Sequence, residues 1–291
     1  MTANVSKDHH YVPRGYLKRW ATGSDGKLVA FFHHARGLDW DRKTPAQTGY
    51  RPHLYTATLN PEFGDALERE FLSKVDDAAS KLMDLFTSGD VVPPLDATQM
   101  NDWSRYLMTL MHRSPARMAG LHEQLAETLK TVNPEITPEL EADYATWKQP
   151  GDPANLADYF ASARPRDVDL GTKKLLAILS NSLPIGTHIN RMTKKVFNLK
   201  GLKHELLTSD QPLIVSGGLG HTNAFLMMAL SPHRLFVATN TIERMSTLAD
   251  AIPSGLLTKE NNASVCQNAE RFVYGSNASQ ASFVRKYFRP R

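Results

Sequence analysis

Four polar residues of this sequence have side chains suited to catalysis: His9 and His10 near the start, Arg113 in the middle and Asp210 in the last third. Histidine transfers protons near neutral pH, a carboxylate can bind a metal or orient a histidine, and arginine can hold a phosphate with two hydrogen bonds. Phosphoryl-transfer chemistry uses these residue types. One hypothesis is therefore a nuclease-like hydrolase of phosphodiester bonds, with nucleic acid as partner. The cofactor stays unknown, although such a site would accept a divalent metal.

The His9-His10 pair sits in a segment with extended character. Adjacent residues on a strand point to opposite faces, so the two side chains cannot easily bind one ion from regular structure. We expect one histidine to face the core and the other a cleft, with His10 preferred for the cleft. The alternative is that both only form hydrogen bonds and anchor the N-terminal segment.

Asp210 lies in the run Thr208-Ser209-Asp210-Gln211-Pro212. A strand before it would deliver the carboxylate to a strand end, because Pro212 forces a turn two residues later. Carboxylates at such positions often bind a metal or orient a histidine. Equally, Asp210 could form an Asx-turn with its own backbone.

Arg113 directly precedes Ser114-Pro115, where a helix is expected to break. An arginine at such a break could clamp a phosphate with two hydrogen bonds. The alternative is an ion pair with an acid of the preceding helix, which offers Glu68, Glu70 and Asp76. Asp65 and Glu68, three residues apart on that helix, could form a catalytic or metal cluster, although surface helices commonly carry such acids.

These residues have to be positioned by three stretches of the chain. Residues 1–60 read as extended and turn-rich, 61–192 as helical, and 194–291 as mostly antiparallel strands. The fold class predicted is α+β in one domain, 1–291. The helical stretch should pack on the C-terminal antiparallel sheet, with the N-terminal segment docked between them.

Apolar spacing and turn residues predict the individual elements. Helices are expected at 67–86, from Asp96 to a break near Pro115, and at 117–131, 138–147, 153–163, 171–192 and 259–269. Strands are expected at 27–32, 51–56, 196–199, 205–208, 212–215, 225–230, 235–239 and 271–274. The later strands are separated by short turns, which favours an antiparallel meander.

Composition excludes several classes of protein. The chain has 291 residues, of which 41% are hydrophobic and 22% charged, with net charge +4. These values are typical of a globular protein, and they permit nucleic-acid contact without requiring it. The single cysteine, Cys266, excludes an internal disulfide and a Cys-rich zinc site. No apolar run approaches membrane-spanning length and no secretory signal is recognisable, so we expect a cytoplasmic protein without membrane contact.

Common nucleotide-binding and hydrolase motifs are not found. The glycine-rich run Ser216-Gly217-Gly218-Leu219-Gly220-His221 lacks the Lys-Ser/Thr of a P-loop and does not match the dinucleotide fingerprint. It reads as a loop between strands. The absence of these motifs is only weak evidence against the common enzyme classes, because a new family can use new motifs.

Four short segments resemble one family. His9-His10-Tyr11-Val12-Pro13, followed by Tyr16-Leu17 and Trp20, is similar to the N-terminal signature of the bacterial family called domain of unknown function 4238. The 208–212 turn, Leu230-Ser231-Pro232 and 271–276 resemble later segments of that family in the same order. Members of that family usually have an aromatic residue where this chain has Gly15, and Phe is commoner than Trp at the position of Trp20. These differences concern local packing. The resemblance implies membership of the group and no established reaction.

A second hypothesis is a non-catalytic interaction module, for example of a phage-defence or stress system. The His-His-Tyr-Val-Pro segment would then be a structural latch between the helices and the sheet. The burial of His9, His10 and Asp210 distinguishes the two hypotheses. Buried, hydrogen-bonded side chains without an adjoining cavity favour the latch, whereas convergence with Arg113 on an open pocket favours the enzyme. Either way, this segment should lie beside the 208–210 turn and near Arg113.

Overall fold

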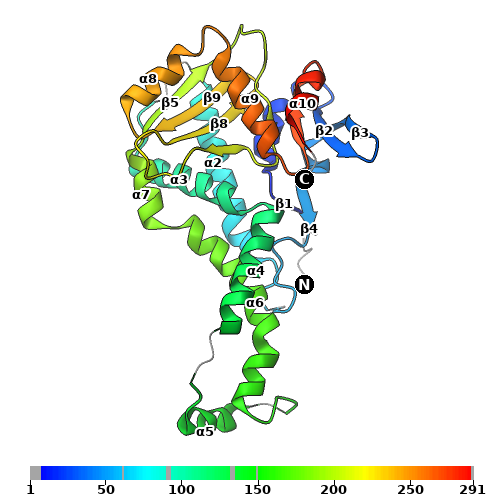
Figure 1. The fold of residues 1–291 in the computed structure, drawn as a ribbon, viewed down its shortest axis with the longest axis vertical. Helices are drawn as coiled ribbons and strands as arrows, with labels where there is room; N and C mark the ends of the chain where they lie inside the picture. Colours follow the sequence, from blue (N-terminus) through cyan, green and yellow to red (C-terminus); the bar gives the residue numbers. More distant parts are fainter. Residues whose placement is uncertain (1–7, 61, 90–92, 132–134, 149, 290–291) are drawn as a thin grey trace.

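The protein is an α+β structure in which helices and antiparallel sheets form separate regions, as predicted (Figure 1). This computed structural model describes residues 8–60, 62–89, 93–131, 135–148 and 150–289. Within these ranges the strands form two four-stranded sheets and one two-stranded sheet.

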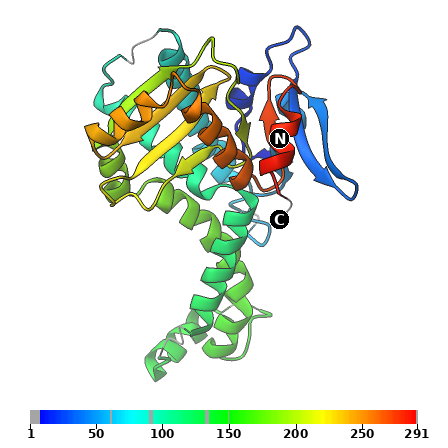
Figure 2. The same cartoon turned by 45° about the horizontal axis from the view of Figure 1, so that its top comes forward.

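The C-terminal sheet has the order β5 (Thr193–Asn198), β9 (Arg234–Thr239), β8 (Phe225–Ser231) and β7 (Leu213–Val215). All its neighbours are antiparallel. Helices cover both of its faces in Figures 1 and 2, which explains why β8 and β9 are apolar runs without polar alternation. On the helical side the ring of Phe236 packs against Phe86 and Trp103, with centroids 6.1 and 5.1 Å away. The predicted packing of the helical stretch on this sheet is confirmed.

The helical stretch contains η3, a π-helix (Leu67–Leu72), α2 (Ser73–Thr87), α3 (Ala97–His112), α4 (Pro115–Thr131), α5 (Pro138–Trp147), α6 (Leu156–Ser180) and α7 (Leu183–Arg191). Asp96 and Gln99 form the predicted capping box at the start of α3. Pro115 separates α3 from α4, as predicted. The lower parts of α4 and α6, with α5, project away from the sheets (Figure 1).

The predicted break between helices 153–163 and 171–192 is wrong. α6 continues through Pro165 and ends at Ser180, after which Pro184 opens α7. An internal proline costs about 3 kcal/mol in a helix, and here packing against α4 offsets that cost. The approach is close at Gly171, where a Cβ would lie 2.7 Å from Leu125 of α4.

The predicted single C-terminal meander is also wrong. β6 (Thr208–Ser209) and β10 (Val273–Gly275) join the N-terminal hairpin of β2 (Leu28–His34) and β3 (Gly37–Lys43) in a second sheet, ordered β3-β2-β10-β6. The expected strand 205–208 shrinks to β6, because the backbone of Leu206 and Leu207 bonds instead with Pro232 and with the side chains of Trp20 and Asn262. The remaining helices are α8 (Ile242–Asp250), α9 (Leu256–Asn268) and α10 (Ala281–Tyr287).

The N-terminal stretch is less extended than predicted. β1 (Asp8–His10) pairs with β4 (Tyr50–Pro52), and between them lie α1 (Arg14–Leu17), η1 (Lys18–Trp20) and η2 (Pro45–Gln47). The Tyr16 hydroxyl donates to the carbonyl of Ala229 at 2.8 Å and accepts from the Thr208 hydroxyl at 2.6 Å. The segment therefore does contact the 208–210 turn, and it ties both four-stranded sheets to α1.

Candidate functional site

His9 is enclosed in the core. Its side chain is 0% exposed, and its Nδ1 accepts a hydrogen bond from the backbone N–H of Tyr55 at 2.9 Å. An accepting Nδ1 places the ring proton of the neutral imidazole on Nε2. The Tyr55 ring stacks on the His9 ring with centroids 5.6 Å apart. His9 is therefore the histidine that faces the core.

Arg113 is a buried link between the helices and β1. Its side chain is 1% exposed and forms two hydrogen bonds with the Asp76 carboxylate, at 2.6 and 3.0 Å. The guanidinium also donates to the backbone carbonyl of His10 at 2.8 Å. The expectation of a phosphate clamp is therefore corrected, because the guanidinium is already occupied. Of the three acids considered as partners, Asp76 is the one that pairs.

His10 turns the other way and borders an open cavity of about 560 Å³. The Nε of Arg14 lies 3.2 Å from Nε2 and 3.3 Å from Nδ1 of the His10 ring. Burial, and then the nearby Arg14 guanidinium, lower the pKa of His10 to about 4. The imidazole is neutral at pH 7 and can hold the charged Arg14 side chain beside it.

Glu68 is the unusual acid of this cavity, which we call the acidic pocket. Burial raises the pKa of the Glu68 carboxyl to about 7, although the charge of Arg113 lowers it. Its Oε2 is buried and has no hydrogen-bond partner among the described residues. Glu68 lies in the π-helical turn η3, and such turns occur frequently at functional sites. The remaining carboxylates that line the pocket are Asp8, Asp65, Asp76 and Asp77.

Two basic side chains stand at the edge of the same pocket. Arg14 and Lys18 are four residues apart along α1 and η1, and both are exposed. No carboxylate of the described chain forms an ion pair with either of them. By contrast, Arg69, which also lines the pocket, is paired with Asp65 and Glu70. The pocket thus combines a protonatable acid with two available cations.

Asp210 lies elsewhere and binds backbone. Its carboxylate accepts hydrogen bonds from the N–H groups of Glu270, Arg271 and Phe272, at 2.9, 2.6 and 3.0 Å. Burial raises the pKa of Asp210 to about 6, and the three donors oppose that rise. Both expectations for Asp210 are corrected: it does not line the acidic pocket, and its partners are sixty residues downstream instead of its own turn.

Replacing Asp210 with alanine should destabilise the protein by about 2 kcal/mol or more, because three backbone donors lose their acceptor in a buried place. Urea denaturation followed by tryptophan fluorescence measures the change. The control is Asp250→Ala at the exposed end of α8, which should be neutral. Equal stability of the two variants would show that solvent replaces the Asp210 carboxylate.

Comparison with known proteins places the chain in a family. The family model described as "Protein of unknown function (DUF4238)" matches residues 8–279. The chain belongs to this family. No curated protein and no solved structure shows significant similarity to it.

For this DUF4238 member, the structure brings together part of the predicted site. His9, His10 and Arg113 meet around Tyr55 and Asp76, whereas Asp210 stands apart. The sequence analysis missed Arg14 and Lys18. Their separation by four residues, directly after the His-His-Tyr-Val-Pro segment, is a signal that could have identified them. Glu68 entered only as a weak cluster candidate, because its burial is not visible in a helical pattern.

Two further findings concern metals and membranes. Among the described residues of this DUF4238 protein, no group of three or more His, Cys, Asp or Glu side chains is arranged to hold a metal ion. Likewise, none of the helices in the described ranges is both long and apolar enough to cross a bilayer.

Proposed function

We propose that this protein hydrolyses phosphodiester bonds in the acidic pocket, with Glu68 as the proton-transfer group. The observation that carries the proposal is the Glu68 carboxyl: it borders an open cavity, its Oε2 has no partner in the described chain, and its pKa lies near 7. An acid that is half-protonated at neutral pH can give a proton to a leaving oxygen or take one from water. A carboxyl in a cleft with a strongly perturbed pKa is a candidate for a functional site.

The substrate class follows from the cations at the edge. Arg14 and Lys18 can each donate to a non-bridging phosphate oxygen, and they neutralise the charge that develops there. His10 would position Arg14 through the contact of Arg14 Nε with its ring. Water would attack phosphorus and release a proton to solvent, while the bond to the leaving oxygen breaks and Glu68 protonates that oxygen. The Glu68 carboxylate would then take a proton back from solvent. Arg113 would hold Asp76 and the backbone of His10, which both line the pocket, and would not bind substrate.

End-labelled DNA and RNA, single- and double-stranded, test this proposal. Cleavage is measured with and without Mg²⁺ or Mn²⁺, because the carboxylates Asp8 and Asp77, which form no ion pair within the described residues, could favour an added cation. Glu68→Gln should lower kcat/KM by about 10²–10⁴-fold, the usual contribution of a general acid or base. The pH profile of the wild type should show an inflection near 7 that the variant lacks. His10→Ala should also lose activity, since Arg14 loses its support.

The matched control is Glu123→Gln on the exposed face of α4, far from the pocket in sequence, which should cleave like the wild type. Wild-type cleavage equal to that of Glu68→Gln would overturn the assignment of Glu68. Failure of the wild type to cleave any of these substrates in any metal condition would overturn the hydrolase itself.

A second candidate is a non-catalytic interaction module. Two observations support it, the hydrogen bonds of Tyr16 and Trp20 to distant parts of the chain and the burial of His9. In this module the signature segment would act as a structural latch. Nucleic acid bound without cleavage, with binding weakened in Lys18→Glu, would favour this module over the hydrolase.

A further inference from the structure

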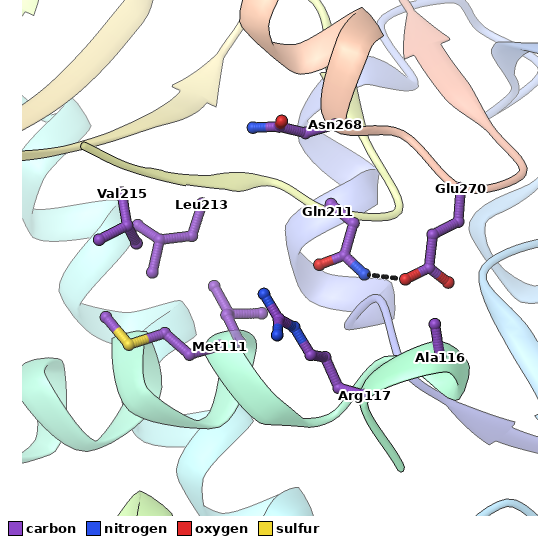
Figure 3. Close-up of a pocket in the computed structure, with 9 residues that line it drawn as sticks. Met111, Ala116, Arg117, Gln211, Leu213, Val215, Asn268 and Glu270 are labelled. Carbon is purple, nitrogen blue, oxygen red and sulfur yellow. Dashed lines mark hydrogen bonds between the residues drawn. The ribbon is translucent and has the colours of Figure 1, made fainter. Parts of the chain in front are cut away.

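A second cavity lies away from the acidic pocket and shares no lining residue with it. Its volume is about 570 Å³, within the range of small-molecule sites. It is open to solvent and is lined by the junction of α3 and α4, by β7, and by the end of α9 with the segment that follows it (Figure 3). None of the residues proposed for phosphodiester hydrolysis contributes to it.

Opposite charges line this cavity without pairing. Arg117 is exposed in the first turn of α4, and Figure 3 shows its side chain extending into the cavity toward the strand that carries Leu213. Glu270 lines the other side, where its Oε1 accepts from Gln211 Nε2 at 2.6 Å and from Ser114 Oγ at 3.1 Å. Within the described ranges, neither Arg117 nor Glu270 takes part in any ion pair, with each other or with another residue. A guanidinium and a carboxylate that share a cavity but stay apart leave room for a ligand carrying both charges.

The remaining lining combines the amides of Gln211 and Asn268 with an apolar side. Leu213 and Val215 project from β7 into the cavity, opposite Met111 of α3 (Figure 3). Leu110 of α3 also lines the cavity. Val215 is 40% exposed, because it points to the face of edge strand β7 opposite the buried Ile214. This side of the cavity can bury an aliphatic side chain, which contributes about 25 cal/mol for each Å² removed from water.

Glu270 and the backbone of Arg117 are held in place before any ligand arrives. Asp210 binds the backbone of Glu270 and the two residues after it, so this segment cannot move freely. The Ser114 hydroxyl accepts from the Arg117 N–H and fixes the start of α4. Arg113, next to Ser114, is anchored by Asp76. Preorganised groups lose little entropy on binding, which favours affinity.

We propose that this cavity binds a zwitterionic ligand with an apolar side chain, that is, a free α-amino acid or a dipeptide of the leucine type. The ligand carboxylate would pair with the Arg117 guanidinium with two hydrogen bonds. The ligand ammonium would bind Glu270, whose Oε2 has no hydrogen bond in the described chain. The side chain would rest on Leu213, Val215 and Met111. This inference is independent of the proposed hydrolase.

Isothermal titration of the full chain with leucine and with leucyl-leucine tests the proposal and separates the two sources. At least one should bind, with heat that saturates in the millimolar range or below. N-acetyl-leucine lacks the ammonium and leucinamide lacks the carboxylate, so each should bind at least about tenfold more weakly, the effect of losing roughly 1.4 kcal/mol.

Two variants locate the site. Arg117→Gln and Glu270→Gln should each weaken binding at least about tenfold, while Arg36→Gln, an exposed arginine in the β2–β3 turn, should bind like the wild type. Circular dichroism confirms that the variants fold. Absence of binding by the wild type, or equal affinity for leucine and N-acetyl-leucine, would overturn the proposal. So would unchanged affinity in the Arg117 variant.

Discussion

Replacing Arg113 with methionine should lower the free energy of unfolding by about 3–5 kcal/mol, the largest effect on stability that we expect from one residue of this protein. Methionine fills a similar volume but leaves the Asp76 carboxylate without its cation. It also leaves the His10 carbonyl without its donor. The side chain of Asp76 retains 21% exposure, so water recovers part of the loss and the lower end of the range applies.

Urea denaturation at pH 7, followed by tryptophan fluorescence, measures this effect. The matched control is Arg42→Met, because Arg42 also pairs with an aspartate, Asp25, but both side chains are well exposed. That variant should lose less than about 1 kcal/mol. The double variant Asp76→Leu/Arg113→Met should be more stable than Arg113→Met alone, since it removes the unpaired charge. A double variant that loses the sum of both single effects would contradict this explanation.

Replacing Glu68 with glutamine should stabilise the protein at pH 8 and leave its stability unchanged at pH 4. The pKa of Glu68 rises from 4.5 to about 7 on folding, so the folded state binds the proton more tightly than the unfolded state. Stability conferred by the protonated carboxyl is complete below pH 4.5 and is lost as the pH rises toward 7. The full difference corresponds to about 3 kcal/mol, and we expect about 2 kcal/mol because the side chain is not fully enclosed.

Unfolding free energies of both proteins at pH 4, 6 and 8 check this sign. His10 provides the comparison, because its pKa is lowered on folding, from 6.5 to about 4. The stability that neutral His10 confers is present above pH 6.5 and is lost as the pH falls toward 4. The stability linked to Glu68 changes with pH in the opposite direction. His10→Gln should therefore reduce the change of the unfolding free energy with pH between about 4 and 6.5. Glu68→Gln should reduce this change between about pH 4.5 and 7. A glutamine variant at position 68 that is less stable than the wild type at pH 8 would contradict the burial of a charged Glu68.

The two predictions concern neighbouring groups with different tasks. Arg113 stabilises the fold by neutralising Asp76, whereas charged Glu68 destabilises the folded protein at neutral pH. Active sites commonly contain groups that lower the stability of the fold, because activity can require a destabilised group. Activity should therefore be tested first with variants of Glu68 and not with variants of Arg113.

The amino-acid sequence by itself determined the features that depend on neighbours along the chain. The capping box at Asp96, the break at Pro115 and the apolar face of the helix that ends near Phe86 follow from backbone sterics and from a period of 3.6 residues. Opposite faces for His9 and His10 follow from strand geometry. These local rules were sufficient for the fold class and for the placement of most helices.

Only the tertiary structure decided which distant groups meet. β10 pairs with β2 across more than 200 residues, Asp210 binds backbone sixty residues away, and Arg113 selects Asp76 among three acids of similar spacing. A single sequence does not reveal these pairings, because each depends on which surfaces are buried together. Interactions between neighbours along the chain do not favour one partner over another. The raised pKa of Glu68 has the same origin: desolvation is a property of the packed chain, and the same glutamate on an open helix would be an ordinary surface acid.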